Sequence, residues 1–572
     1  MIILGLNYVY HDTSACIVSD GNLLVALEEE RFTRSKHTSD FPRNAIDRCF
    51  EVADVQAADV DHIAVSFDPR LHAGKRLVYA AKLGLQGIEL LKCEFLRPHR
   101  QQKIFWRWYA ENWPDADRKP TVHFIDHHRS HIAGSFFVSP YEKAALLSID
   151  GSGEWSTHWM GEYDGTRFVK FSESFFPHSL GAFYEAATEF CGFRTNYDEG
   201  KTMGLAPFGD PEPFFDTVNK MVDILPNGEI RMDLSWFEYQ TFVPRRTSRK
   251  FVEVLGEPRQ MLPTAPFEKY HENVAASFQK VLEEKVLEMC RLLERKSTAE
   301  YLVIAGGVSL NSVMNGRILR ETRFKDVYVM PAAGDNGTSI GAAYVVWNEV
   351  LGKRTRYSLD NPFLGTGYGD EQIEALLKVF KLDYVKSGDV CADAAKILYS
   401  GQIIGWFQGR MEIGPRALGS RSILADPTSA HMKQKINAEV KYREPYRPFA
   451  PSSTAEAFRD YFEVPVEDPF MLKVGNVRPE WRERLAAITH VDGSARLQTV
   501  NRETNPLYHQ LLTEFGTLSG VEVLLNTSFN VMGEPVVESP EQAIRCFYST
   551  GLDALVIGSF IVRKDSAAAR QP

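Results

Sequence analysis

The sequence predicts an α/β protein with a duplicated N-terminal domain, residues 1–352, followed by a second α/β domain, residues 353–572. Residues 1–31 read as strand, polar loop, strand, Asp20-Gly21 turn and strand, and an Asp-Gly turn between apolar runs is a strong hairpin signal. Residues 144–171 repeat this scheme, which indicates two related halves. The polar, glycine-rich run at 352–370 is typical of a linker between domains.

The composition narrows the class of protein. With 572 residues, 44% of them hydrophobic, the chain is too long for one core. No apolar run approaches the roughly 18 residues that span a bilayer, and "MIILGLNYVYHD" lacks a signal peptide's basic region, so we expect no membrane partner. Seven scattered cysteines without a CxxC pair predict reduced thiols in the cytoplasm. The net charge of −10 argues against a nucleic-acid partner.

Four potential metal ligands lie in the N-terminal domain. His127 and His131 are four residues apart after a strand-like run, so on a helix they share one face. Asp150 ends the strand "LLSID", and Asp335 lies in a glycine-rich turn. Two imidazoles and two carboxylates suit Fe²⁺, Mn²⁺ or Zn²⁺. The alternatives are that Asp150 caps its loop and that Asp335 caps a helix near Thr338; convergence in one cleft would favour the metal.

Two other features of this domain could serve a ligand. Gly306-Gly307 follows the strand "YLVIA" and precedes a helix start near Asn311, an arrangement that suits a nucleotide or phosphate. The alternative is that the two glycines serve packing alone. Residues 271–296 form an amphipathic helix with an apolar stripe.

The second domain is rich in cations beside rigid backbone. Between residues 410 and 447 there are eight Lys and Arg residues, several next to Pro or Gly. Proline fixes the local backbone and so aims a guanidinium, which suits planar carboxylate or phosphate groups. "LLNTSFNVMGEP" adds neutral donors, and "HVDGSARLQTV" adds another arginine, Arg496. A solvated basic face is the alternative, but it would lack the interleaved Pro, Gly and apolar residues.

The motifs "HDTSACIV", "HHRSH", "SIDGSGEW", "GKTMGLAPFG", "GGVSLN", "GDNGTSIGAA", "GRMEIGPRALGSRSILADP", "VKYREPYRPFAP" and "LNTSFNVMGEPVV" occur in this order over nearly the whole chain. The chain thereby resembles the O-carbamoyltransferase family that includes nodulation protein U and antibiotic-tailoring carbamoyltransferases. That resemblance implies an N-terminal Kae1-like domain of actin-like (ASKHA) fold and a C-terminal YrdC-like domain. The duplicated, hairpin-led halves also resemble the plan of the actin, Hsp70 and sugar-kinase superfamily.

The resemblance implies an activity and assigns roles to residues. The YrdC-like domain would make carbamoyl-adenylate from carbamoyl phosphate and ATP with Mg²⁺, and the Kae1-like domain would transfer the carbamoyl group to a hydroxyl of a small-molecule acceptor. Fe²⁺ is the implied metal. The residues that match functional positions are, for the metal, His127, His131, Asp150 and Asp335; for catalysis, His11 and Lys36; and for carbamoyl phosphate and ATP, Arg416, Lys441, Arg447, Arg496 and Ser528. The glycine turn at Gly306, Gly307 and Asn311, which suits a nucleotide, is expected to bind the adenylate in the Kae1-like domain.

The acceptor is not specified by these motifs. Residues 70–107 hold nine Lys and Arg against two acidic residues, and we hypothesise that this segment covers the acceptor site. An exposed basic helix or a homodimer contact is the alternative. Two other functions stay open at this point: an actin-like kinase, which would release ADP, and a non-catalytic nucleotide-binding scaffold.

Overall fold

The computed structural model describes residues 1–114, 119–241, 245–262 and 265–564. The chain divides into two compact units. The first comprises Met1–Glu29 and His37–Leu359, and the second comprises Glu30–Lys36 and the chain from Asp360 onward. The segment Glu30–Lys36 therefore belongs with the second unit, although it lies between two segments of the first in the sequence.

The first unit contains two five-stranded sheets with the same strand order. In the first sheet, β3-β2-β1-β4-β5, the first three strands form an antiparallel meander, and β4 and β5 continue parallel to β1. The second sheet, β8-β7-β6-β11-β12, repeats this order and these directions. The two sheets thus share one strand order, which agrees with the repeated hairpin pattern in the sequence. The strands are β1 (Ile2–Asn7), β2 (Ser14–Ser19), β3 (Asn22–Glu28), β4 (His62–Val65), β5 (Thr121–Phe124), β6 (Ala144–Gly153), β7 (Ser156–Tyr163), β8 (Phe168–Phe175), β11 (Tyr301–Ala305) and β12 (Asp326–Val329).

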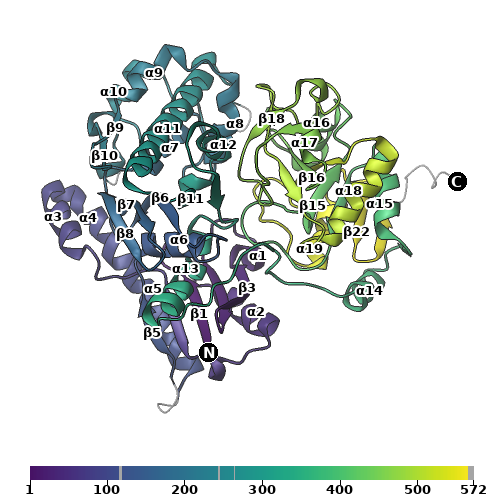
Figure 1. The fold of residues 1–572 in the computed structure, drawn as a ribbon, viewed down its shortest axis with the longest axis horizontal. Helices are drawn as coiled ribbons and strands as arrows, with labels where there is room; N and C mark the ends of the chain where they lie inside the picture. The colour runs from purple at the N-terminus through teal and green to yellow at the C-terminus, as the bar shows by residue number, and fades with distance from the viewer. Residues whose placement is uncertain (115–118, 242–244, 263–264, 565–572) are drawn as a thin grey trace. The chain divides into compact units, whose positions relative to one another are not determined.

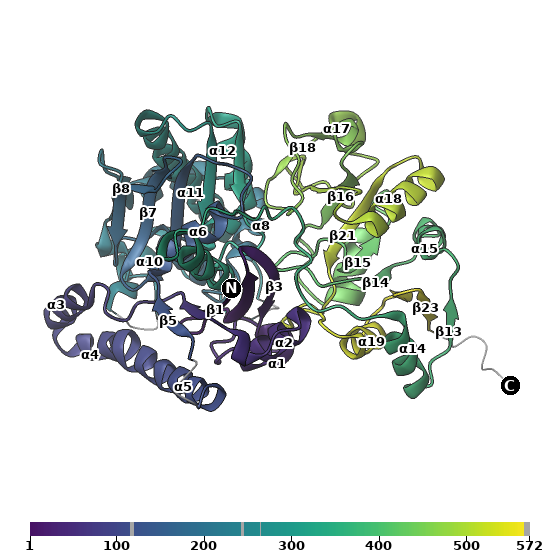
Figure 2. The ribbon, with the colours of Figure 1, turned by 60° about the horizontal axis from the view of Figure 1, so that its bottom comes forward.

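Two buried helices lie between these sheets. α6 (His127–Phe136) packs on β6 and β11, and α13 (Thr338–Val345) packs on β1, β2 and β4 (Figure 1, Figure 2). The two helices touch backbone to backbone, because a Cβ added to Gly134 would lie 3.1 Å from Gly341 Cα. Only glycine permits so close an approach. The start of α6 and the loop before α13 are thereby brought together.

The remaining helices of the first unit cover the outer faces. The longest, α11 (Lys269–Lys296), includes the amphipathic helix expected at 271–296, and its apolar stripe packs against α7 (Leu180–Phe190). None of the helices within the described ranges has the length and apolar composition needed to cross a bilayer. The other elements of this unit are α2 (Arg43–Ala53), α3 (Ala73–Leu83), α4 (Gly87–Leu91), α5 (Arg97–Asn112), α8 (Glu199–Leu205), α9 (Glu212–Asn219), α10 (Arg249–Leu255), α12 (Ser312–Glu321), β9 (Val222–Ile224) and β10 (Ile230–Met232).

The second unit is built on an eight-stranded mixed sheet of order β13-β23-β22-β14-β15-β21-β16-β20. Alternate residues of its central strands enter two different cores: Ile404 and Trp406 face one, and Phe407 faces the other. This is the two-residue period of a strand buried on both faces. The strands are β13 (Tyr384–Lys386), β14 (Ile404–Phe407), β15 (Arg421–Ala425), β16 (Ala450–Thr454), β20 (Gln498–Val500), β21 (Val523–Ser528), β22 (Ala554–Ile557) and β23 (Phe560–Arg563), with β17 (Phe462–Glu463), β18 (Gly475–Val477) and β19 (Ser494–Ala495) in a small separate sheet.

Helices cover both faces of the large sheet. α15 (Val390–Tyr399) and α18 (Pro506–Ser519) pack together on one face, while α14 (Asp370–Val379) and α19 (Pro540–Tyr548) lie on the other. α1 (Glu30–Thr33), α16 (Met432–Lys435) and α17 (Phe458–Tyr461) are single turns. The predicted linker at 352–370 contains no helix or strand before α14 begins at Asp370.

Candidate functional site

The two histidines lie on the first turns of α6 and point in the same direction. Asp126 caps the helix, because its Oδ1 accepts a hydrogen bond from the backbone N–H of Arg129 at 2.5 Å. This cap starts the helix at His127 and so sets the direction of both imidazoles. The Nε2 atoms of His127 and His131 lie 3.0 Å apart, and both side chains are buried. The helical pair predicted from the spacing is confirmed.

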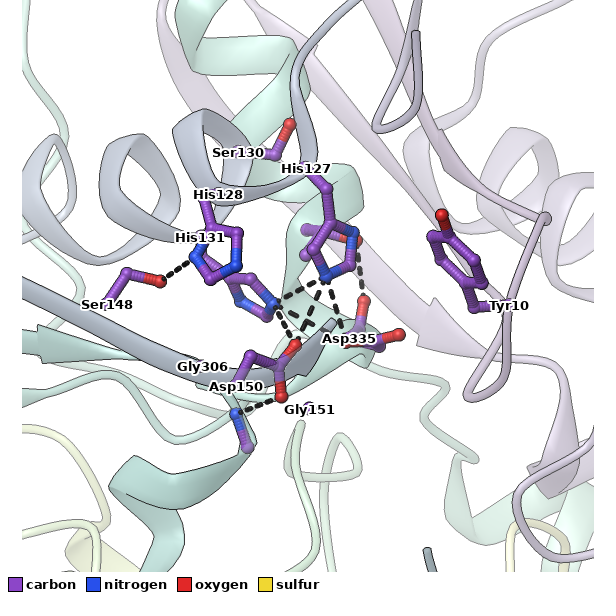
Figure 3. Close-up of polar contacts among 12 residues, drawn as sticks. Tyr10, His127, His128, Ser130, His131, Ser148, Asp150, Gly151, Gly306 and Asp335 are labelled. Atoms are coloured by element: carbon purple, nitrogen blue, oxygen red, sulfur yellow. Dashed lines mark hydrogen bonds and ion pairs between the residues drawn. The ribbon is translucent and has the colours of Figure 1, made fainter. Parts of the chain in front are cut away.

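Two carboxylates complete this group (Figure 3). Asp150, on β6, places Oδ2 3.2 Å from His127 Nε2 and 3.1 Å from His131 Nε2. Asp335, in the loop before α13, places Oδ1 3.4 Å from each of the same nitrogens. One donor atom from each of the four residues therefore faces a common point. Asp335 does not cap α13, because that helix begins after Gly337 without a side-chain cap and the carboxylate of Asp335 faces the histidines.

Further hydrogen bonds hold the carboxylate of Asp150 and the backbone of Asp335. The backbone N–H of Gly307 donates to Asp150 Oδ1 at 3.0 Å, and Asn7 Nδ2 donates to the backbone carbonyl of Asp335 at 3.0 Å. The neighbouring His128 bonds Ser148 Oγ at 2.8 Å and the Ser156 carbonyl at 3.0 Å, so its ring is turned away from the group (Figure 3). Such outer contacts fix ligand orientation in metal centres.

The spacing of the four donor atoms fits a divalent metal ion. Ligands at about 2.1 Å from one ion stand about 3.0 Å apart in octahedral geometry and about 3.4 Å apart in tetrahedral geometry. The five separations that involve a histidine Nε2, 3.0–3.4 Å, span this range, and all four donor atoms lie within 4.8 Å of one another. Two imidazoles and two carboxylates form the borderline donor set that iron, manganese or zinc accepts. The group is therefore a candidate metal centre.

The electrostatics of the group also suit a cation. Burial opposes charge on His127, but the carboxylates of Asp335 and Asp150 outweigh it and raise the pKa of His127 well above 6.5. Burial likewise opposes charge on Asp150, and the two histidines hold the pKa of Asp150 well below its usual value. The carboxylates are thus ionised at neutral pH, and a metal ion can take the place of the histidine protons.

His11 lies beside the candidate metal centre and is partly exposed. Its Nε2 is 3.9 Å from Asp335 Oδ2, and its Nδ1 is 2.9 Å from Asp12 Oδ2. Burial lowers the pKa of His11, whereas the carboxylates of Asp335, Asp12 and Asp150 raise it, with a net value of about 10. Asp12 in turn contacts His37, whose Nδ1 is 2.7 Å from Asp12 Oδ1. The sequence motifs indicated His11, but not the pairing of Asp12 with His37.

The glycine turn expected at an adenylate has structural roles here. Gly306 has a φ of +87°, which favours glycine, and an added Cβ would collide with the carbonyl carbon of Ile149 at 2.7 Å. Asn311 caps α12 by accepting from Met314 N at 3.1 Å, and its amide pairs with Gln279. The binding of an adenylate at Gly306, Gly307 and Asn311 stays a prediction.

The second unit contains five cationic side chains that lie close enough to repel one another electrostatically. We name them the cation cluster: Arg416, Lys441, Arg443, Arg447 and Arg496. Burial and then the repulsion of neighbouring arginines lower the pKa values of Arg416, to about 10, and of Arg496. The Nε of Arg496 is buried and has no hydrogen-bond partner in the described part of the chain. Repelling, incompletely paired cations are stabilised when an anion binds.

Lys441 is buried and is held by the end of β21. Its Nζ donates to Ser528 Oγ at 3.3 Å, to Asn530 Oδ1 at 2.7 Å and to the backbone carbonyls of Ser528 and Asn530. The predicted residues Lys441 and Ser528 are therefore in direct contact. Burial, and then the charges of Arg443 and Arg447, lower the pKa of Lys441. The charge of Lys36, whose segment is part of the same unit, is a smaller cause in the same direction.

Not all of the eight cations at 410–447 belong to this cluster. Arg421 is fully buried, donates to four backbone carbonyls and stacks on Phe407 at 3.7 Å. Its role is to hold β15 and its neighbouring loops together. Arg443, which the motifs did not single out as a site residue, is in the cluster and is fixed by Asn437 Oδ1 at 2.8 Å.

Comparison with known proteins supplies the family. The model described as Carbamoyltransferase N-terminus matches residues 2–344, which hold all four potential metal ligands. The model described as Carbamoyltransferase C-terminus matches residues 395–564, which hold the cation cluster. The two regions together cover most of the chain.

Individual relatives agree with these matches. An uncharacterized protein of Synechocystis sp. is 40% identical over 100% of this chain and 98% of its own length. Nodulation protein NolNO of Sinorhizobium fredii is 37% identical over 98% of this chain and 80% of its own. The 3'-hydroxymethylcephem-O-carbamoyltransferase of Amycolatopsis lactamdurans is 31% identical over 63% of this chain and 64% of its own. The chain therefore belongs to the carbamoyltransferase family of enzymes.

Proposed function

We propose that this protein is an O-carbamoyltransferase that works in two half-reactions. The second, YrdC-like unit makes carbamoyl-adenylate from carbamoyl phosphate and ATP, and the first, Kae1-like unit transfers the carbamoyl group to a hydroxyl of a small natural-product or sugar-type acceptor. The name of the Amycolatopsis relative supports an acceptor of this class. The observation that carries the proposal is the cation cluster in the family's C-terminal region, because both proposed substrates of that unit are polyanions.

The adenylate-forming step needs fixed positive charge. Water cleaves carbamoyl phosphate to carbamate and phosphate; a carbamate oxygen then attacks the α-phosphorus of ATP, and pyrophosphate leaves. Arg416, Arg447 and Arg496 would bind the phosphate groups, since arginine recognises such oxygens with paired donors. Lys441, held by Ser528, would supply a point charge. Lys36 is in the same unit and acts on Lys441, so we assign it to this anion site, and its catalytic role beside His11 stays a prediction.

The transfer step would take place beside the four metal ligands. When bound to His127, His131, Asp150 and Asp335, a divalent ion such as Fe²⁺ would supply Lewis-acid chemistry. Its charge would also offset Asp335 and Asp150, two of the three carboxylates that raise the pKa of His11, and so lower that pKa toward the neutral range. His11 Nε2 would then accept the proton of the acceptor hydroxyl as its oxygen bonds the carbamoyl carbon and AMP leaves.

The acceptor would be covered in part by the basic segment 70–107. Within it, α5 places Arg97 Nη2 3.1 Å from the backbone carbonyl of Tyr10, next to His11 in the sequence. The ring of Tyr10 meets that of His127 edge to face at 5.5 Å between centroids (Figure 3). Arg100 and Arg107 are exposed on the same helix. These positions support a role for α5 in choosing the acceptor.

The proposal is tested by separating the two half-reactions with one variant. His127→Ala is expected to lower bound iron and to abolish transfer of label from [¹⁴C]carbamoyl phosphate to a hydroxymethylcephem, while ATP- and carbamoyl phosphate-dependent pyrophosphate release persists. The change removes a first-unit ligand and leaves the cation cluster untouched. Retention of both metal and transfer would contradict the metal assignment. ADP formation without pyrophosphate would instead indicate a kinase.

A further inference from the structure

Three side chains form a continuous line that begins at the candidate metal centre. His11 presents Nε2 toward Asp335 and Nδ1 to one oxygen of Asp12, at 2.9 Å. The other oxygen of Asp12 meets His37 Nδ1 at 2.7 Å. Each carboxylate oxygen of Asp12 thus contacts one imidazole. His37 lies 4.2 Å from Tyr197 between ring centroids, in an edge-to-face arrangement.

The backbone places these side chains at a cost in strain. Asp12 and His37 both have positive φ angles, of 51° and 54°, a region that is uncommon for residues other than glycine, although Asn, Asp and His enter it more often than most. Asn7 holds the first loop, because its Nδ2 donates to the carbonyls of His11 and Asp12, each at 3.1 Å, and of Asp335. The backbone N–H of Thr13 donates to the Thr38 carbonyl and joins the two loops. Strained backbone that the surroundings hold in place is often tied to function.

The arrangement determines which nitrogen of His11 is basic. A carboxylate at Nδ1 keeps the proton on that nitrogen, so the free electron pair is on Nε2, the atom that faces Asp335. Such a carboxylate also stabilises the imidazolium that forms when Nε2 accepts a proton. His37 donates a hydrogen bond to the second oxygen of Asp12 and so limits the rotation of that carboxylate. The carboxylate that orients His11 is thereby fixed.

We propose that Asp12 and His37 are positioning residues for carbamoyl transfer: His37 holds Asp12, and Asp12 holds His11 with Nε2 directed at the acceptor hydroxyl. This inference rests on the proposed function. In the step, the acceptor oxygen forms a bond to the carbamoyl carbon and its proton moves to His11 Nε2. The bond from the carbamoyl carbon to the phosphate oxygen breaks, and AMP leaves with the electron pair. The proton on Nδ1 stays between His11 and Asp12.

The test compares two variants that both tolerate the positive φ of residue 37. His37→Asn keeps an N–H donor near the position of Nδ1, whereas His37→Gly removes the donor. The acceptor would be whichever of hydroxymethylcephem, glycerol and simple sugars the wild-type protein carbamoylates fastest. With this acceptor, we expect His37→Gly to lower the kcat of carbamoyl transfer at least tenfold. The KM for that compound should change less than twofold, and His37→Asn should stay within threefold of wild-type kcat.

Two controls separate this inference from the proposed function and from loss of folding. Pyrophosphate release and bound iron should be unchanged in both variants, since neither change touches a metal ligand or the cation cluster. Wild-type kcat in His37→Gly, or an equal loss in His37→Asn, would overturn the inference. Asp12→Asn gives a second check, because it should lower kcat at least as much as His37→Gly. Wild-type protein that carbamoylates no hydroxyl compound would overturn the proposed function itself.

Discussion

A single methyl group added at Gly153 should disrupt the candidate metal centre without removing any ligand. Gly153 is the last residue of β6, three positions after the ligand Asp150, and it lies against His127. An alanine Cβ at this position would be 2.7 Å from His127 Cβ and closer still to the imidazole ring. The substitution therefore displaces one ligand, and it neither adds nor removes a polar group.

The size of the effect follows from these distances. Non-bonded carbon atoms need about 3.6 Å between them, so His127 must move by about 0.9 Å or more in Gly153→Ala. Metal–ligand distances tolerate only about 0.2 Å. We therefore expect metal affinity to fall at least 10- to 100-fold, the range typical when a ligand loses its orientation. Overpacking should also lower the free energy of unfolding by about 1–3 kcal/mol.

The matched control is Gly151→Ala, two residues earlier on the same strand. There the added Cβ would meet only Glu185 Oε1, at 3.6 Å, which is ordinary van der Waals contact. Both variants would be loaded anaerobically with Fe²⁺ and desalted, and iron per chain would be measured by mass spectrometry, with circular dichroism to monitor folding. Folded Gly153→Ala that binds iron as tightly as wild type and Gly151→Ala would refute the reasoning.

Three further outcomes follow from the structure. Arg496→Ala should lower carbamoyl phosphate-dependent pyrophosphate release at least 100-fold with bound iron unchanged; near-normal release would remove Arg496 from the anion site. Changing Arg97, Arg100 and Arg107 together to Gln should raise the acceptor KM and spare pyrophosphate release, and an unchanged KM would argue against a role for α5. Burial, and then the charge of His128, lower the pKa of His158 to about 3. The imidazole of the unfolded chain binds a proton near pH 6.5, whereas the folded protein resists this proton down to about pH 3. The free energy of unfolding should therefore decrease as the pH is lowered from about 6.5 to 3, by up to about 1.4 kcal/mol per pH unit. Urea denaturation at several pH values should show a smaller slope in His158→Gln, and an equal slope would contradict this.

Local sequence patterns predicted much of the candidate metal centre. His127 and His131 are four residues apart on a capped helix, and Asp150 lies three residues before the end of β6 rather than at its end, as the sequence predicted, so short-range geometry directs these side chains. The repeated hairpin pattern likewise predicted that both halves share a strand order. These features depend on periodicity and turn chemistry, which are visible in a few adjacent residues.

Other parts of the site depend on contacts between distant segments. The segment Glu30–Lys36 belongs to the second unit, although its neighbours in sequence do not, and no local pattern indicates this. Arg421 and Arg443 are equally basic in the sequence, yet one is bound to backbone carbonyls and the other is in the cation cluster. The pairing of Asp12 with His37 requires two strained loops to meet, which spacing alone does not reveal.

The central claim, that carbamoyl transfer proceeds through an adenylate made in the second unit, is tested most directly without an acceptor. Purified protein would be incubated with ATP, Mg²⁺ and carbamoyl phosphate, and pyrophosphate would be measured in wild type and in Arg416→Ala. The account predicts release that depends on carbamoyl phosphate and is lost in the variant. Formation of ADP without pyrophosphate, or release that Arg416→Ala leaves unchanged, would contradict it.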